Sequence, residues 1–197
     1  MTEDARLTGA ALEQRLLGRK EEILEDWRRA VLATYPAETA SFAMAEKDPF
    51  CDPIGHALIR TGHALWEMAM TGMERQRAEE NLRDIVRIRA VQDFSPSQAL
   101  SFVDAMRKAI RRKIPAVAVE KTGLNHLLCI ESRLDEAMFV AVDLYVACKK
   151  QIDDIRIREA KAANERLLRL IKAMDRRGEP GDLREPSRRG KAGGTPQ

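Results

Sequence analysis

Histidine and cysteine side chains are the first candidates for chemistry in this sequence, because they bind metals, carry protons and act as nucleophiles. His56 and His63 are seven positions apart, so a helix would place them on one face, and Cys51 stands just before them. A structural zinc site normally takes four ligands in closely spaced pairs, and the sequence has no such pair. We therefore predict ordinary helix positions for these residues and no metal site.

Haem ligation is the second chemistry that histidine could supply. His126 precedes two leucines and is a candidate haem ligand if the fold resembles a globin, with His56 and His63 as weaker candidates. Against this, aromatic residues make up only 5% of the chain, and a single histidine on a partly apolar helix is more often a satisfied side chain. We predict no cofactor, and a haem-binding, globin-type sensor is kept as an alternative.

The sequence lacks the motifs that position a nucleophile or a phosphate group. Covalent catalysis needs a serine, cysteine or threonine beside a general base, together with donors for an oxyanion. Gly-x-Ser-x-Gly, a glycine-rich phosphate loop and a dinucleotide fingerprint are all absent from the sequence. No catalytic residue is assigned, and we predict that the protein is not an enzyme.

The densest charged cluster is basic and consists of Arg107, Lys108, Arg111, Arg112 and Lys113. It falls at the C-terminal end of an expected helix, where the helix dipole favours each positive charge by a few tenths to about 1 kcal/mol. Contact with an acidic partner or with phosphate groups is the alternative interpretation. Because no aromatic residues alternate with these charges for stacking on bases, we predict no nucleic-acid partner.

Charge balance and cysteine content favour a cytoplasmic protein. The chain of 197 residues has 34 basic and 31 acidic side chains, a net charge of +3, so no basic excess indicates nucleic acid or anionic lipid. Cys51, Cys129 and Cys148 are far apart and odd in number, which favours reduced thiols. We find no signal peptide and no run of about 20 apolar residues, and so expect no membrane span.

The elements that must position these residues are helices, because apolar residues recur at helical spacing almost throughout. The predicted fold class is all-α. Thr8 is expected to cap one long helix that ends at Tyr35-Pro36, and a short helix follows with Phe42 and Met44. Residues 47–56, KDPFCDPIGH, contain two prolines and a glycine and break the pattern.

Three further helices are expected, and a sharp corner separates the second from the third. The first carries Ile54 to Ala69 and ends at Thr71-Gly72, and the second begins near Glu74. After the corner, Ser95 is a helix cap and Pro96 suits the first helical turn, where its missing N–H costs nothing. An apolar face then continues to Ile114.

The longest predicted element carries a helical pattern from Leu124 to Met174 without a proline or glycine. Residues 135–148 are apolar on nearly every side, as expected for a helix packed on several sides. Beyond Lys149 the apolar residues narrow to a stripe: Ile152, Ile155, Ala160, Ala163, Leu167, Leu170, Ile171 and Met174. We predict that this stripe pairs with a second copy or docks on a partner, with folding back on its own domain as the alternative.

The predicted organisation has four parts. Residues 1–8 form a flexible N-terminus, residues 9–150 a helical sensor domain, and residues 151–174 an extended helix for dimerisation or docking. Residues 175–197 form a basic tail with six basic and four acidic side chains. Its many prolines and glycines and few apolar residues predict disorder.

Two stretches resemble one known family. They are LLGRKEEILEDWRRAVLATYP at residues 16–36 and LRDIVRIRAVQDFSPSQALSFVDAMRKAI at residues 82–110. Together they are similar to the RsbRD N-terminal domain family, the helical sensor domain of RsbT co-antagonist (stressosome) proteins. The matching features are Trp27, the Tyr35-Pro36 end, and Arg89-Ala90 leading into Phe94-Ser95-Pro96-Ser97, and the resemblance spans roughly residues 10 to 150.

The resemblance implies a non-haem, globin-like bundle that forms a homodimer and modulates an output partner in bacterial signalling. Family members often continue into a STAS domain that binds a switch kinase. This sequence has only the polar tail after Met174 and resembles a stand-alone member without a STAS domain, so kinase binding and stressosome assembly are not carried over. KDPFCDPIGH further resembles stand-alone members associated with sulfur-metabolism gene clusters, and the alternative is an adaptor or assembly factor for such an enzyme complex.

Non-repetitive backbone between helices is a common place for ligands, and two segments have this character. The candidate ligand or partner residues are Phe50, Cys51, Pro53 and His56 in the first segment and Phe94, Ser95 and Pro96 in the second. The alternative, that both segments are only well-capped connections, stays open.

Overall fold

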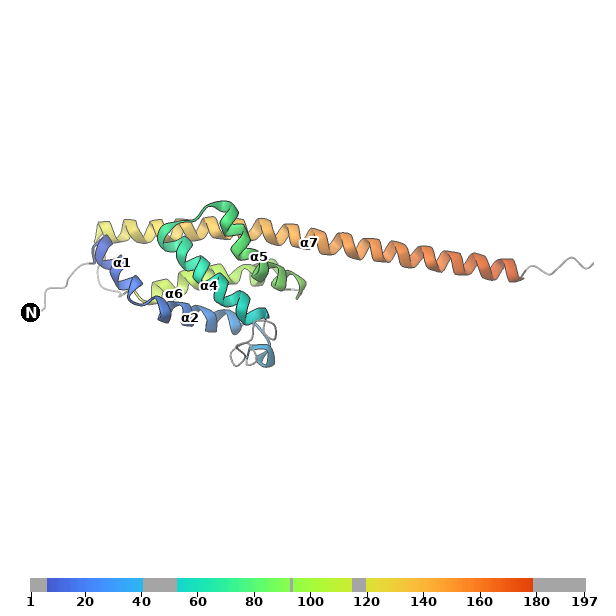
Figure 1. Ribbon diagram of the computed structural model, residues 1–197, viewed down its shortest axis with the longest axis horizontal. Helices are drawn as coiled ribbons and strands as arrows, with labels where there is room; N and C mark the ends of the chain where they lie inside the picture. The colour runs from blue at the N-terminus through green and yellow to red at the C-terminus, as the bar shows by residue number, and fades with distance from the viewer. Residues whose placement is uncertain (1–6, 41–52, 93, 115–119, 179–197) are drawn as a thin grey trace, which may run out of the picture. The chain divides into compact units, whose positions relative to one another are not determined.

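A computed structural model describes residues 7–40, 53–92, 94–114 and 120–178 (Figure 1). The helices are α1 (Gly9–Leu17), α2 (Lys20–Leu32), α4 (Pro53–Thr71), α5 (Arg75–Val91), α6 (Pro96–Arg112) and α7 (Lys121–Gly178). The predicted all-α fold with a long C-terminal helix is confirmed. The chain forms two units, Met1–Asp153 and Asp154–Gln197, and the boundary falls within α7.

The N-terminal segment contains two helices where the sequence predicted one. Thr8 caps α1 as expected, because its Oγ1 accepts a hydrogen bond from the Ala11 N–H at 3.2 Å. The helix breaks at Gly18 and Arg19, where the Arg19 N–H donates to the Leu16 carbonyl, three residues back, at 3.1 Å. Glycine costs about 1 kcal/mol relative to alanine inside a helix, so the break falls at a weak point.

The predicted boundaries around α4 and α5 are confirmed. α4 ends at Thr71, and Gly72 follows with φ +80°, a left-handed conformation that glycine adopts without steric cost. The last carbonyls of a helix lack helical donors. Arg133 of α7 supplies them, because its Nη1 donates to the Met70 carbonyl at 2.6 Å and to the Ala69 carbonyl at 3.2 Å.

The predicted start of α6 is also confirmed. Ser95 is the N-cap and Pro96 lies in the first turn. The Ser95 Oγ accepts from the Gln98 N–H at 3.4 Å, and the Ser95 N–H donates to the Gln98 Oε1 at 3.1 Å. This reciprocal pair is a capping box, which fixes the direction in which the chain enters the helix.

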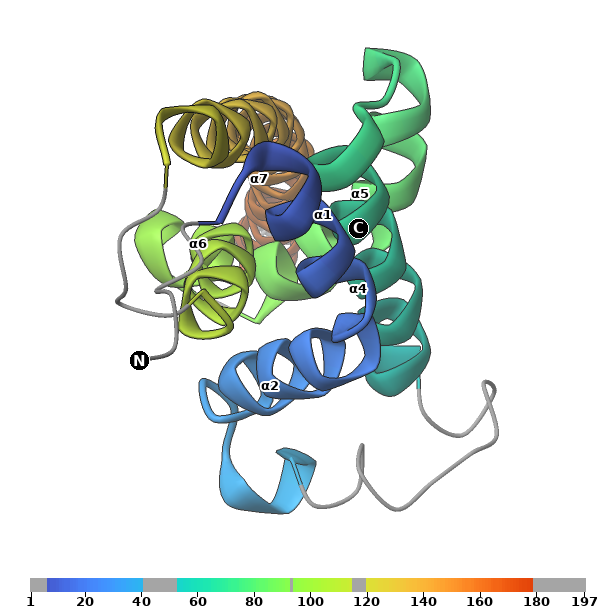
Figure 2. The same ribbon diagram turned by 90° about the vertical axis from the view of Figure 1, so that its left-hand side faces the viewer.

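The core of the first unit is centred where α2, α4 and α6 meet. Figure 2 shows α2 and the first turns of α7 on opposite sides of this unit, with α4 and α6 between them. Trp27 of α2 is 1% exposed, and its Nε1 donates to the Phe102 carbonyl of α6 at 2.7 Å. Gly62 of α4 leaves room for its ring, because a Cβ at this position would lie 2.7 Å from the Trp27 Cζ3.

Within the first unit, α7 up to Asp153 packs on the other helices along one side only. Its buried residues there include Ile130, Leu134, Ala137, Ala141 and Tyr145. The expectation that residues 135–148 pack on several sides is therefore wrong for a single chain. A second set of apolar side chains is exposed on another face of α7. Its members follow one another at spacings of 3, 4 or 11 residues, which keep them on one side of a helix. They are Leu124, Leu128, Phe139, Val142 and Val146.

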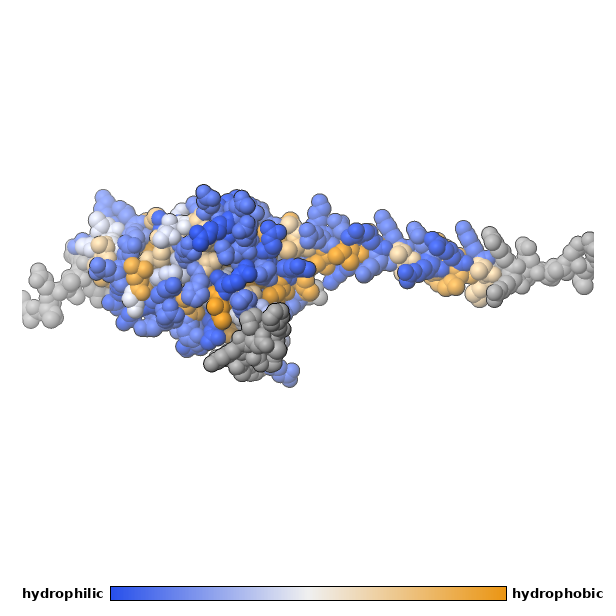
Figure 3. All heavy atoms as spheres, viewed as in Figure 1, coloured by the Kyte–Doolittle hydropathy of each residue, from blue (hydrophilic) through white to orange (hydrophobic). Residues whose placement is uncertain are grey.

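The described part of the second unit is a helix, residues 154–178 of α7. All its side chains from residue 154 to residue 174 are exposed, including the leucines of the predicted stripe. Figure 3 shows apolar residues in patches along this segment among hydrophilic ones. Within the part of the chain that the structure describes, no helix combines the length and the apolar character needed to cross a bilayer.

Acidic residues of the same unit pair with most of the basic cluster. Arg107 pairs with Asp135, Lys108 with Asp104 at 2.7 Å, and Arg111 with Glu131 at 2.5 Å. Lys113 contacts Asp26 at 2.9 Å and Glu22 at 3.2 Å. These pairs favour the structural interpretation of the cluster over contact with an acidic partner.

The ion pair between Lys113 and Asp26 predicts a pH-dependent effect. The hydrogen bond from Lys113 lowers the pKa of Asp26 below its ordinary value of 3.8, against the opposing effect of desolvation. A lowered carboxyl pKa stabilises the folded state above the unfolded pKa, and this contribution is lost as the pH falls through the folded pKa. Asp26→Asn should therefore lower the free energy of unfolding modestly at neutral pH.

Urea denaturation at pH 7 and along a series descending below pH 3.8 measures this difference. Wild type and Asp26→Asn should converge as the pH falls. The control is Asp153→Asn, which replaces an exposed aspartate. A difference between wild type and Asp26→Asn that stays constant across the series would contradict the assignment.

Candidate functional site

The structure brings together parts of the two segments that the sequence selected. The N-terminal turn of α4 lies beside the C-terminal turn of α5, and the two border a cavity of about 590 Å³. This α4–α5 cavity is lined by Pro53, Ile54, His56, Ala57, Asp84, Arg87, Ile88, Val91 and Gln92. Two of the candidates, Phe50 and Cys51, lie outside the described residues.

A second cavity, of about 540 Å³, lies at the corner between α5 and α6 and shares Gln92 with the first. We call it the corner cavity; its walls are Thr34, Tyr35, Pro36, Thr39, Gln92, Phe94 and Gln98. Of the predicted corner residues, Phe94 lines this cavity. Ser95 and Pro96 are exposed and begin α6, so their part is to position Phe94 rather than to line the cavity.

A buried arginine lies behind two walls of the corner cavity. Arg89 of α5 is 0% exposed. Its guanidinium carbon lies 5.0 Å from the centre of the Tyr35 ring and 4.6 Å from the centre of the Phe94 ring. The two rings meet edge to face with centres 5.4 Å apart. Cation–π contacts at these distances stabilise the position of the charge.

The hydrogen bonds of Arg89 leave part of its guanidinium unused. Nη2 donates to the Gln98 carbonyl at 2.8 Å, to the Thr34 Oγ1 at 3.0 Å and to the Ser101 Oγ at 3.4 Å. All three acceptors are neutral. Nε and Nη1 are buried without an acceptor, and Arg89 makes no ion pair within the described residues.

Tyr35 has a second unsatisfied polar group beside the same cavity. Its Oη is buried and has no hydrogen-bond partner in the described part of the chain. Burial raises the pKa of Tyr35, and the nearby Arg89 opposes part of this shift through its charge and its side-chain interaction with the hydroxyl. A buried polar group without a partner costs free energy, so the cluster of Arg89 and Tyr35 is not optimised for stability alone.

Two hydrogen bonds connect the corner directly to α7. The Tyr145 hydroxyl donates to the Phe94 carbonyl at 3.0 Å, and the Lys149 Nζ donates to the Ala90 carbonyl at 3.3 Å. These carbonyls lie on the two sides of the corner. A movement of Phe94 or of the end of α5 therefore changes hydrogen bonds made by α7.

Arg89 and Tyr35 were not among the site residues predicted from the sequence. A signal for Arg89 was present, because it follows Leu82 by seven residues and Ile85 by four and so lies on the apolar face of α5. A charged residue on a buried helix face is rare unless it has a partner or a function. The contact of Arg89 with Tyr35 joins distant parts of the chain and has no comparable signal.

The three histidines lie in different places. His56 and His63 are exposed on α4 and line different cavities, the α4–α5 cavity and one of about 220 Å³ beside Trp27. His126 is partly buried near the start of α7, and its Nε2 has no partner in the residues described. Within these residues no group of three metal-binding side chains comes together.

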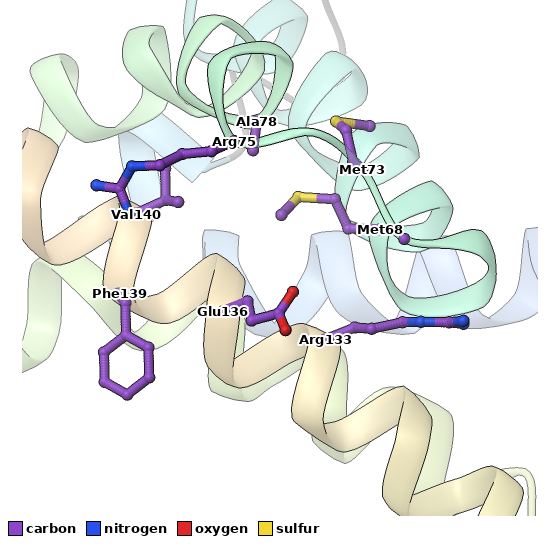
Figure 4. Close-up of a pocket in the computed structure, with 9 residues that line it drawn as sticks. Met68, Met73, Arg75, Ala78, Arg133, Glu136, Phe139 and Val140 are labelled. Carbon is purple, nitrogen blue, oxygen red and sulfur yellow. The ribbon is translucent and has the colours of Figure 1, made fainter.

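A further cavity, of about 240 Å³, lies between the α4–α5 turn and α7 (Figure 4). Met68 and Met73 face it from one side, and Arg133 and Glu136 lie on the α7 side. Figure 4 shows the Phe139 ring pointing away from the two methionines. The Arg133 guanidinium already caps α4. The described residues that line this cavity therefore offer no unsatisfied buried group comparable to those of Arg89 and Tyr35. The corner is the stronger candidate site.

Comparison with known proteins identifies the family of this chain. The sequence matches the family model for the RsbT co-antagonist protein RsbRD N-terminal domain over residues 21–160. The match covers more than half of the chain and includes the corner, and the chain belongs to this family of stressosome-type signalling domains. No curated protein and no solved structure matches the chain.

Proposed function

We propose that this protein is a non-enzymatic sensor or regulatory domain in which the α5–α6 corner controls α7. The observation that supports this most directly is the pair of hydrogen bonds from Tyr145 and Lys149 to the main chain on the two sides of the corner. A signal that repacks Phe94 would strengthen or weaken these bonds. Such a switch needs two packings that differ by a few kcal/mol and a ligand or partner that favours one of them.

We propose that α7 delivers the output by pairing with α7 of a second copy. Its exposed apolar residues support this, since Phe139 is 66% exposed and Leu170 is 62% exposed. Exposed apolar patches mark interaction sites in soluble proteins. The stripe beyond Lys149 has the spacing of a helix that pairs with another helix.

A cytoplasmic location is part of the proposal. Cys129 is exposed and Cys148 is partly buried, and both are free thiols. Free thiols are typical of reducing compartments. A regulatory role without catalysis agrees with the family, whose members are sensor-type signalling domains.

The coupling is tested by Tyr145→Phe, which removes one hydroxyl and keeps the buried ring. We expect a loss of about 0.5–1.5 kcal/mol in local stability, the usual net value of one hydrogen bond. Amide hydrogen exchange should then become faster, by up to about tenfold, both in the corner and in the α7 turn around Tyr145.

Exchange in α2 serves as the internal control, because α2 makes neither of the two bonds and its rates should not change. Faster exchange confined to the α7 turn, with the corner unaffected, would contradict control of α7 by the corner.

A further inference from the structure

We propose that the corner cavity binds a small, singly charged organic carboxylate, which Arg89 recognises. This inference rests on the proposed function, because it names the chemistry of the signal that the corner would sense. It starts from the buried guanidinium, whose Nε and Nη1 have no acceptor among the described residues.

Electrostatics favour a carboxylate beside Arg89. Burying a charge is costly unless an opposite charge or a full set of hydrogen bonds compensates it. The acceptors around Arg89 in the described residues are a carbonyl and two hydroxyls, all neutral. A carboxylate would supply both the missing charge and acceptors for the unused donors, and carboxylates are preferred partners of guanidinium groups.

The net charge of the site favours a monoanion. None of the described residues that line the corner cavity is itself charged. The Arg89 guanidinium behind these walls supplies one positive charge, so a monoanion matches the site better than a dianion. The amides of Gln92 and Gln98 and the hydroxyls of Thr34 and Thr39 can bind polar groups on the rest of the molecule. A volume of about 540 Å³ is within the usual range for small-molecule sites.

A ligand reaches the charge past two aromatic rings. The rings of Tyr35 and Phe94 both line the cavity and cover the guanidinium. Among the described residues, the one group that interacts with the Tyr35 hydroxyl is Arg89, so turning this ring breaks no bond to another part of the fold. Displacing Phe94 instead would disturb the carbonyl that accepts from Tyr145. Binding next to Arg89 is thus connected to α7 through Phe94.

The fold does not depend on Arg89 for its hydrogen bonds. The Thr34 hydroxyl also donates to the Val31 carbonyl at 2.6 Å, and the Ser101 hydroxyl donates to the Gln98 carbonyl at 2.8 Å. Removing the guanidinium therefore leaves none of its three acceptors without a partner. Arg89→Met should keep the fold, which allows the loss of binding to be measured separately from unfolding.

The test titrates the full chain with sodium acetate, lactate, pyruvate and benzoate at constant ionic strength, with sodium chloride as the blank. The readouts are the midpoint of thermal unfolding and isothermal titration calorimetry. We expect at least one of the four salts to bind saturably, at one site per chain, and to raise the midpoint. Arg89→Met should weaken this binding at least tenfold. Arg83→Gln, which changes an exposed arginine on the same helix, should leave it unchanged.

Three outcomes would overturn the proposal: no saturable binding of any of the four salts, equal binding by wild type and Arg89→Met, or tighter binding of succinate or inorganic phosphate than of every monocarboxylate. If Arg89→Met does not fold, Thr39→Trp tests whether the carboxylate binds in the corner cavity, because the larger side chain on the cavity wall fills the space. Undiminished binding by that variant would also overturn the proposal.

Failure of the inference and failure of the proposed function can be told apart by hydrogen exchange around Tyr145. Carboxylate binding that leaves this exchange unchanged supports the site and contradicts its control of α7. The converse result is that Tyr145→Phe speeds up exchange in both the corner and α7 while no carboxylate binds. That result supports control of α7 by the corner and contradicts the carboxylate as its ligand.

Discussion

Replacing Leu167 and Leu170 together by glutamine is expected to raise the dissociation constant of the proposed dimer by at least about a thousandfold. Burial of one leucine side chain contributes about 1.5–3 kcal/mol, and each substitution occurs in both copies. Every 1.4 kcal/mol changes the constant tenfold, so even partial burial gives this effect. Both side chains are exposed in the single chain, so the variant should fold normally.

Light scattering over a series of protein concentrations measures the effect. Wild type should have twice the mass of one chain, and the double variant the mass of a single chain. The matched control is Glu165→Gln with Lys172→Gln, which adds the same number of glutamines on the opposite side of the helix. A wild-type protein that is monomeric at every concentration would contradict dimerisation through α7.

Trp27→Ala is expected to lower the free energy of unfolding by about 3–5 kcal/mol, the usual cost of removing a large buried aromatic side chain. Trp27 fills the space between α2, α4 and α6, and the substitution also removes the hydrogen bond to the Phe102 carbonyl. Because domains are stable by only about 5–15 kcal/mol, much of the stability depends on this one side chain. Urea denaturation followed by circular dichroism gives the value.

Gly62→Ala tests the same contact from the other side. Its Cβ would clash with the buried Trp27 ring, so we expect a loss of about 1–3 kcal/mol in wild type. In the Trp27→Ala background the ring is gone and the loss should largely disappear. Gly18→Ala is the control, since its Cβ would meet only ordinary contacts. Equal losses from Gly62→Ala in both backgrounds would show that the ring is not the cause.

Helix boundaries were predictable where local chemistry decides them. Ser95, Pro96 and Gln98 form a cap with atoms that are neighbours in the chain, and Gly72 ends α4 through its own backbone freedom. The break at Gly18 was not predicted. Apolar spacing continues across it from Leu16 to Ile23, and both residues are buried, so periodicity alone gives no sign of the interruption.

The candidate site was predictable only in part, because its contacts join distant segments. Non-repetitive backbone correctly drew attention to Phe94, which lines the corner cavity. The contact of Arg89 with Tyr35 depends on how α5 packs beside the residues that follow α2, which local sequence does not specify. The apolar face of α7 around Phe139 was predicted to be buried because composition cannot tell whether the same chain or another one covers a face.

The independent hydrogen bonds of Thr34 and Ser101 have an evolutionary consequence. A residue whose loss leaves its neighbours satisfied can be replaced in one mutational step without unfolding the protein. Selection for folding alone would then not retain an arginine at position 89. A lineage that no longer needs the charge would be free to fill this position with an apolar side chain and keep the same bundle.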